Sequence, residues 1–236
     1  MPTGETASER LRHKIGLIGP GVTLPARLLL EHPRAAELYP RYLATGYHIT
    51  QGMISLMVAA LERARALRPA DPVASGLAEY LERHLAEEMH HKEPGGAVLD
   101  DLHALGVDAQ AMVEESYSPK IASLLATQHE RILHEHPVAV LGFLELEAYH
   151  TEPPAVERLI EITGLPREGF GQLLLHAKLD AVHADQLHEV LDSLPLEPGH
   201  EQLIGLSALH TIGVVTDVLL DVVETGMSSR LEAPQS

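Results

Sequence analysis

Apolar residues recur along most of this chain at the three- and four-residue spacing that places them on one side of an α-helix. Runs in which apolar and polar residues alternate, which are typical of half-buried strands, are few. Leu, Ala, Glu and Arg, all of which favour helices, are abundant in the same segments. The pattern therefore predicts an all-α protein.

Proline and glycine divide the chain into successive helical segments. Residues 1 to about 23 are expected to form a loose arm with one or two short helical turns. Gly106 and Gly164 are expected to cap the ends of two helices, and Pro166 to open a long one. The predicted helices span residues 33–67, 73–91, 97–105, 118–134, 137–150, 153–162, 166 to Pro195, and 201–224.

The length of 236 residues fits one domain with a sizeable core. We expect this domain over residues 24–226, after the N-terminal arm of 1–23 and before a flexible tail of 227–236. Only 3% of the residues are aromatic and Trp is absent, so Leu, Val, Ala and Ile must build most of the core.

Charge and composition exclude several classes of protein. The formal net charge of −17, with no basic cluster, argues against a nucleic-acid partner. The N-terminus is polar and acidic, unlike a secretory signal. The apolar stretch of residues 212–223 is interrupted by Asp217 and Asp221 and is too short to span a bilayer. With no cysteine to demand an oxidising compartment, we expect a soluble, cytoplasmic protein without a membrane partner.

The most informative chemistry lies in the long helix that Pro166 opens. His176, Asp180 and His183 occupy positions i, i+4 and i+7, within roughly 60° of arc on one helix face. Neutral imidazole and carboxylate groups suit zinc, iron or manganese. Taken alone, the triplet is equally typical of a solvated helix face in a chain with 16 histidines. Asp185 and His188 fall off this face and are expected in solvent, and Lys178 points away from it.

A second segment repeats the spacing. His84, Glu88 and His91 again stand at i, i+4 and i+7, and Glu87 is a neighbouring carboxylate. Two helices can therefore each turn a carboxylate and imidazole face toward a shared interior. Convergence of such residues from several helices is how dinuclear iron or manganese centres are built.

Glu145 and Glu147 provide a third source of carboxylate within the apolar run of residues 140–149. An unpaired acid is costly to bury, so each must lie on a wet face or bind a cation. The two residues are about 200° apart on a helix, and we expect only one of them to point inward.

Several segments together resemble a known family, the haem-oxygenase-like diiron oxidases and oxygenases, in the branch of iron-containing redox enzymes. The resemblance covers most of residues 30–195 in order and spacing, and is carried by residues 32–43, 87–93, 99–106, 141–147, 176–183 and 191–194. It implies a single-domain bundle of about seven helices that holds two irons and reacts with dioxygen. The ligands that it implies are Glu88, His91, Glu147, His176, Asp180 and His183, with His84, Glu87 and Glu145 as the alternatives.

The resemblance implies an enzyme, a non-haem diiron oxidoreductase of specialised metabolism. The expected substrates are an amino acid, an amine or a fatty-acid-like carboxylate, oxidised by N-oxygenation, desaturation or C–C cleavage. The expected cofactor is two Fe(II), with manganese as the alternative metal. The expected partners are this small molecule, dioxygen, an electron donor and a second copy in a homodimer. The alternative functions are a cofactor-independent or hydrolytic enzyme on the same bundle and a non-catalytic metal- or ligand-binding protein.

Overall fold

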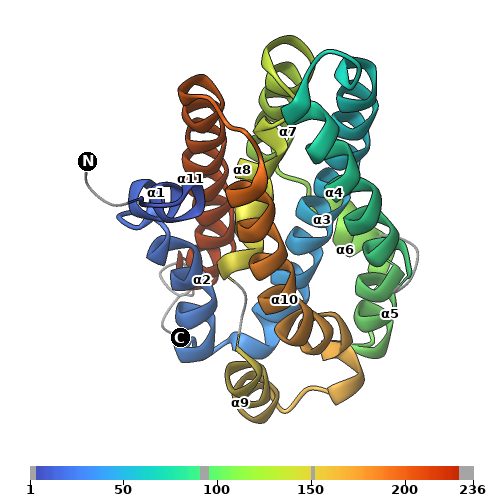
Figure 1. Ribbon diagram of the computed structural model, residues 1–236. Helices are drawn as coiled ribbons and strands as arrows, with labels where there is room; N and C mark the ends of the chain where they lie inside the picture. The colour runs from blue at the N-terminus through green and yellow to red at the C-terminus, as the bar shows by residue number, and fades with distance from the viewer. Residues whose placement is uncertain (1–3, 91–95, 150–151, 229–236) are drawn as a thin grey trace, which may run out of the picture.

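The computed structural model describes residues 4–90, 96–149 and 152–228, and every regular element in these ranges is helical (Figure 1). The all-α prediction is therefore confirmed. The α-helices are α1 (Ala7–Ile15), α2 (Pro20–Glu31), α3 (Ala35–Leu67), α4 (Pro72–His90), α5 (Gly96–Ala104), α6 (Ala109–Glu115), α7 (Pro119–Glu130), α8 (Ala139–Leu144), α9 (Pro153–Thr163), α10 (Gly171–Ser193) and α11 (Pro198–Ser228). Three short elements join them: the π-helical turn η1 (Arg131–Glu135) and the 3-10 turns η2 (Glu145–Tyr149) and η3 (Arg167–Phe170).

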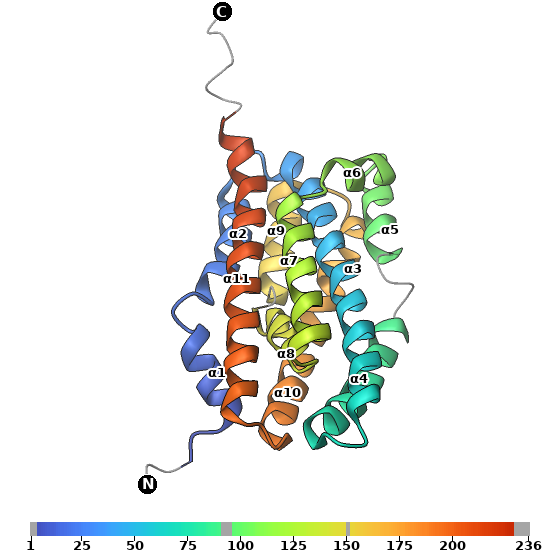
Figure 2. The same ribbon diagram turned by 90° about the horizontal axis from the view of Figure 1, so that it is seen from above.

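Two long helices organise the bundle. α11 packs against α8, α2, α3 and α7, whereas α3 packs against α4 and α6 as well. Figure 2 shows α11, α7 and α3 side by side. α10 crosses the face of the bundle that is nearest the viewer in Figure 1, where it contacts η2, α1, α5, α9 and α4.

The N-terminal segment differs from the loose arm expected over residues 1–23. α1 and the first part of α2 lie in this range, and both pack on the bundle. Leu11 and Ile15 are buried in the main apolar core. Thr6 and Glu9 form a capping box at the start of α1. The stretch is polar overall, but its few apolar residues share one face of a helix, and this short pattern is enough to dock it.

The predicted breaks between helices largely match the structure. Gly164 ends α9 at φ 62° and Gly106 follows α5 at φ 75°, the left-handed conformation that glycine adopts without strain. α4 is described as far as His90 and α5 from Gly96, so the break predicted at Pro94-Gly95-Gly96 falls largely outside the described residues. α6 was not predicted. It begins at Ala109, directly after Asp108, whose side chain caps the helix by accepting a hydrogen bond from the amide of Ala111.

α11 is a long, predominantly apolar helix of the core. One 18-residue window within Pro198–Glu224 has a mean hydropathy of 1.8, and 56% of that window is buried. The helix is long and apolar enough to cross a membrane, but the structure uses its apolar face against five neighbouring α-helices, α8, α2, α3, α7 and α1. Asp217 and Asp221 lie on its exposed side. This is the arrangement of a core helix in a bundle.

α10, which carries the histidine triplet, is fixed at both ends. At its start the side chain of Asp101 accepts a hydrogen bond from the amide of Gln172 at 2.7 Å. Just before it, Phe170 stacks on Tyr39 with ring centroids 4.3 Å apart. At its end Asp192 accepts hydrogen bonds from the amide and hydroxyl of Ser8, at 2.8 and 2.9 Å. These contacts set the position and rotation of the helix.

The contact between α8 and α11 gives a test of the packing. A Cβ atom on Gly142 would lie 2.3 Å from the carbonyl oxygen of Ile204 and 2.7 Å from the amide nitrogen of Ala208, so it would push two backbones apart. We predict that Gly142→Ala lowers the free energy of unfolding by about 1–3 kcal/mol, measured by urea denaturation.

The matched control is Gly213→Ala, because a Cβ atom on Gly213 meets nothing within 4 Å. That variant should be as stable as the parent or gain up to about 1 kcal/mol from helix propensity. Equal stability of the two variants would contradict the close packing of α8 on α11.

Candidate metal centre

Four side chains from three separate segments meet inside the bundle. His84 and Glu88 come from α4, Glu147 from η2 and His183 from α10, and each offers a donor atom within 4.8 Å of the other three. Donors that share one metal at a bond length of about 2.1 Å lie at most about 4.2 Å apart. The cluster is therefore only slightly wider than a metal-bound set.

His84 lies at the middle of this group. Its Nε2 is 3.1 Å from Oε1 of Glu147, and its ring meets that of His183 edge to face with centroids 4.8 Å apart. Tyr80, one turn earlier on α4, stacks on the other face of His84 at 5.3 Å. Burial lowers the pKa of His84, but the hydrogen bond to Glu147 and the negative charges of Glu147, Glu88 and Glu87 together outweigh this effect, so the pKa lies above its ordinary value.

The donor set fits a metal ion because its buried nitrogens are not all satisfied by the protein. His84 is 1% exposed and His183 is 4% exposed, yet Nδ1 of each ring makes no hydrogen bond. Nδ1 of His183 lies 3.4 Å from Oε1 of Glu88 without hydrogen-bond geometry. Buried polar atoms without partners are rare and costly. Imidazole and carboxylate donors in this arrangement suit zinc, iron or manganese.

His176 and Asp180 form a second pair beside the first group. Nδ1 of His176 is 2.8 Å from Oδ1 of Asp180, and both residues precede His183 on α10. Burial opposes protonation of His176, but the Asp180 hydrogen bond, with the negative charges of Glu88 and Glu147, raises its pKa above the ordinary value. The His176–Asp180 pair therefore interacts electrostatically with Glu88 and Glu147 of the four-residue cluster.

The remaining ligand alternatives separate as follows. Of the two neighbouring acids on α4, Glu88 joins the cluster, whereas Oε2 of Glu87 is 4.0 Å from Nε2 of His183 and 42% of its side chain is exposed. His84 was an alternative in the sequence and is central in the structure. His91 lies outside the described residues.

The expectation that only one of Glu145 and Glu147 points inward is wrong. Glu147 is 7% exposed and faces His84, whereas Glu145 is fully buried and its Oε1 lies 3.3 Å from Nε2 of His188. The reason is that η2 is wedged between α8, α10, α11 and α2, so that both of its sides are covered.

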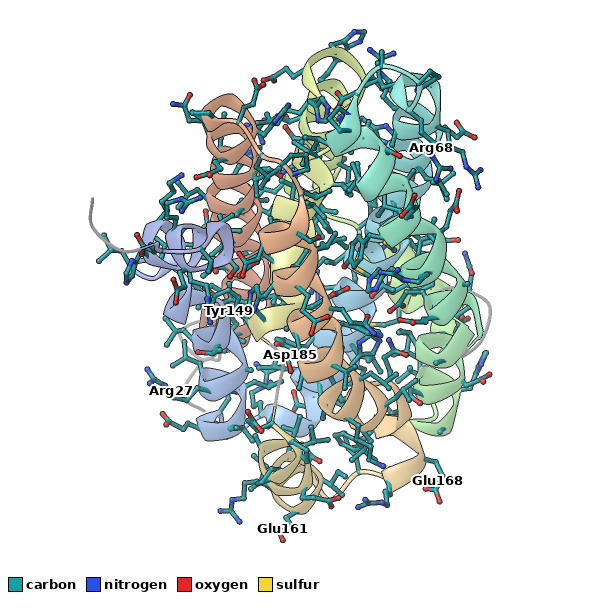
Figure 3. The ribbon with its side chains drawn as sticks, viewed as in Figure 1. Arg27, Arg68, Tyr149, Glu161, Glu168 and Asp185 are labelled. Carbon is teal, nitrogen blue, oxygen red and sulfur yellow. The ribbon has the colours of Figure 1, made fainter. Side chains whose placement is uncertain are left out.

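His188 was expected in solvent and is instead the partner of Glu145, with 18% of its side chain exposed. No spacing signal within α10 points to this pairing, because the partner comes from another segment. Asp185 is exposed as expected, and Figure 3 shows it on the outer side of α10. Lys178 is exposed too.

A cavity of about 210 Å³ opens beside His176 and Asp180. Its walls come from α3, α5, η2 and α10, and it lies next to the α10 face that carries the two donors. Tyr149, which lies beside α2 in Figure 3, closes one side. Its lining residues are Tyr42, Leu43, Gly46, Thr50, Val98, Leu146, Tyr149, Gln172, Leu173, His176, Ala177 and Asp180.

Comparisons with known proteins support the fold and leave the family open. No protein-family model matches the chain, and no curated protein matches it in sequence. A solved domain of unknown function with a haem oxygenase-like fold, from Shewanella denitrificans OS217, is similar over 96% of each chain with a TM-score of 0.73 at 16% identity. A TenA homologue from Pseudomonas syringae pv. tomato str. DC3000 is similar over 92% of each chain, with a TM-score of 0.66 at 12% identity. The chain therefore has a haem oxygenase-like fold, as the resemblance implied.

The positions of the two glutamates of η2 predict which of them holds a metal. Glu147→Gln should reduce the ferrous iron retained after desalting, because an amide supplies no negative charge and binds iron weakly. Glu145→Gln is the matched control and should retain the parent's metal content, since Glu145 faces His188.

Metal analysis of the two purified variants checks this expectation, with circular dichroism to show that both are folded. The opposite outcome, with metal lost only in Glu145→Gln, would move the ligand to the other side of η2.

Proposed function

We propose that this protein is a non-haem diiron enzyme that uses dioxygen to oxidise a small organic molecule. The observation that carries the proposal is the group of His84, Glu88, Glu147 and His183, two imidazoles and two carboxylates brought together from three segments of a bundle. This is the donor chemistry of dinuclear iron and manganese centres in helical bundles. The haem oxygenase-like fold agrees with the resemblance seen in the sequence.

In the proposed enzyme the cluster holds one iron, and His176 and Asp180, together with His91, hold the second. Glu88, Glu147 and Asp180 offset most of the four positive charges of two divalent ions. The four histidines bind as neutral imidazoles, which requires that metal binding displaces any proton they carry. Manganese is the alternative metal for the same donors.

In this enzyme the irons would activate dioxygen for the oxidation, and the protein would orient the substrate and exclude water. Leu43, Val98 and Leu146 give the cavity beside His176 an apolar wall, which would limit the access of water to a bound substrate. Asp180 already holds the ring of His176 in one orientation through its hydrogen bond. In this scheme the small molecule occupies the cavity, and an electron donor acts from outside.

A non-catalytic metal-binding protein would share the donor set. Consumption of dioxygen by the iron-loaded protein after reduction separates this alternative from the proposed enzyme. A cofactor-independent or hydrolytic enzyme on the same bundle would need no iron at all, so metal stoichiometry separates it.

Iron binding gives the direct test. The purified protein should bind about two ferrous irons per chain under anaerobic conditions, and His91→Ala and His183→Ala should each lose at least one. His103→Ala is the matched control, because His103 is exposed on α5 and should not affect loading. Full loading of both ligand variants, measured by metal analysis, would contradict the proposed centre.

The stability of α10 gives an independent test. Without a cation, the helix buries Asp180, His183 and the half-buried His176 with few partners, so its middle should open locally more often than its anchored ends. We expect ferrous iron to slow amide hydrogen exchange across residues 174–186 by tenfold or more, as metal binding couples to local folding.

The amides of residues 203–219 on α11, which hold no candidate ligand, serve as the internal reference. Equal exchange across residues 174–186 with and without iron would mean that this segment is a rigid structural helix.

A further inference from the structure

The polar groups that line the cavity beside the donors include a carboxylate but no lysine or arginine. Its walls are mainly apolar, and the polar atoms among them are those of Tyr42, Thr50, Tyr149, Gln172 and the His176–Asp180 pair. Burial raises the pKa of Tyr42 to about 12, and burial together with Glu145 raises that of Tyr149, so both phenols stay neutral. No Lys or Arg is among the residues that line it, all of which lie in the described part of the chain.

The charge around the cavity is negative. Asp180 forms part of the wall, and the carboxylates of Glu88 and Glu147 act on His176 from behind it. Even with His176 protonated, these three carboxylates leave an excess of negative charge. Lys178, the nearest cationic residue along α10, is exposed and acts on Glu157 on the outside. The only positive charge that a carboxylate ligand could meet on these walls is a protonated His176, which Asp180 already pairs, whereas an ammonium group would meet Asp180.

We propose that the cavity binds a small apolar amine, with its ammonium group directed to Asp180 and its carbon chain against Leu43, Val98 and Leu146. The bound amine would be a substrate only if the proposed function holds, so the inference rests on that function. It narrows the three expected substrate classes to amines. The three carboxylates Glu88, Glu147 and Asp180 offset most of the charge of two divalent ions, so iron loading leaves little positive charge to attract a free acid. The cavity supplies hydrogen-bond acceptors for the amine, from Gln172 and the Asp180 carboxylate.

The size of the cavity limits the amine. A volume of 210 Å³ equals that of about seven water molecules at roughly 30 Å³ each. Amines with about seven to ten non-hydrogen atoms fit this space, and long fatty chains do not. Gly46 leaves part of the wall open, because a Cβ atom built on it meets nothing within 4 Å. A larger side chain at this position of α3 would enter the cavity without clashing with the backbone.

The test compares three six-carbon probes that differ only in their head group: hexylamine, 1-hexanol and hexanoate. Binding to the full chain is measured by isothermal titration calorimetry at pH 8, first with metal removed and then with ferrous iron under anaerobic conditions. Hexylamine should bind at least about tenfold more tightly than hexanoate in both states, with hexanol between them. Asp180→Asn should abolish most of this preference, whereas Asp185→Asn, on the exposed side of α10, should keep it.

A filled cavity provides the second arm. Gly46→Leu should remove hexylamine binding while the melting temperature stays the same or rises, and Gly213→Leu, on an open surface of α11, should bind hexylamine as the parent does. Hexylamine binding that survives in Gly46→Leu would mean adsorption to the acidic surface and would overturn the proposal.

Hexanoate that binds as tightly as hexylamine in the metal-free protein would also overturn it, as would a preference for hexanoate that arises only with iron. The metal-free arm does not depend on iron. If the protein binds hexylamine but no iron, the amine-binding proposal stands and the diiron function fails. Failure of the amine proposal can therefore be distinguished from failure of the proposed function.

Discussion

The structure depends on one constraint, the burial of carboxylates and imidazoles within an apolar helical bundle. His84, Glu145, Glu147, Asp180 and His183 are all less than 9% exposed. A buried charge without a partner destabilises a fold by several kcal/mol, roughly the whole net stability of a domain. The helices therefore place these groups against each other, Glu147 at His84, Glu145 at His188 and Asp180 at His176. The ring nitrogens that still lack partners are where a cation would most increase stability.

Positioning of the donors comes from contacts far from the donors themselves. Asp101 and the Tyr39–Phe170 stack hold the start of α10, and Ser8 holds its end through Asp192. Between these points, the 3.6-residue period fixes which side chains face inward. The N-terminal helix α1, which contributes no candidate ligand, thereby helps to set the rotation of the helix that carries three of them.

Periodicity within one helix predicts much of this arrangement, and contacts between helices explain what it misses. The spacing of His176, Asp180 and His183 and its repeat at His84 and Glu88 were visible in the sequence, because these residues share a face of their own helix. The burial of both Glu145 and Glu147 was not visible, because it depends on what covers each side of η2. The pairing of Glu145 with His188 was missed for the same reason. A periodic pattern says which residues point the same way, but not which helix lies opposite them.

The cavity and the donors share α10, and this relation bears on how the proposed enzyme would couple its ligands. Gln172, Leu173, His176, Ala177 and Asp180 line the cavity, and Asp180 and His183 continue the same face toward the cluster. A molecule in the cavity and a metal at the cluster would each order the same turns of helix. The second to bind would then find part of that ordering already complete, so each would increase the affinity of the other to the same extent. In such an enzyme the metal centre would be most fully assembled when the cavity is filled, which protects the protein from oxidation in the absence of substrate.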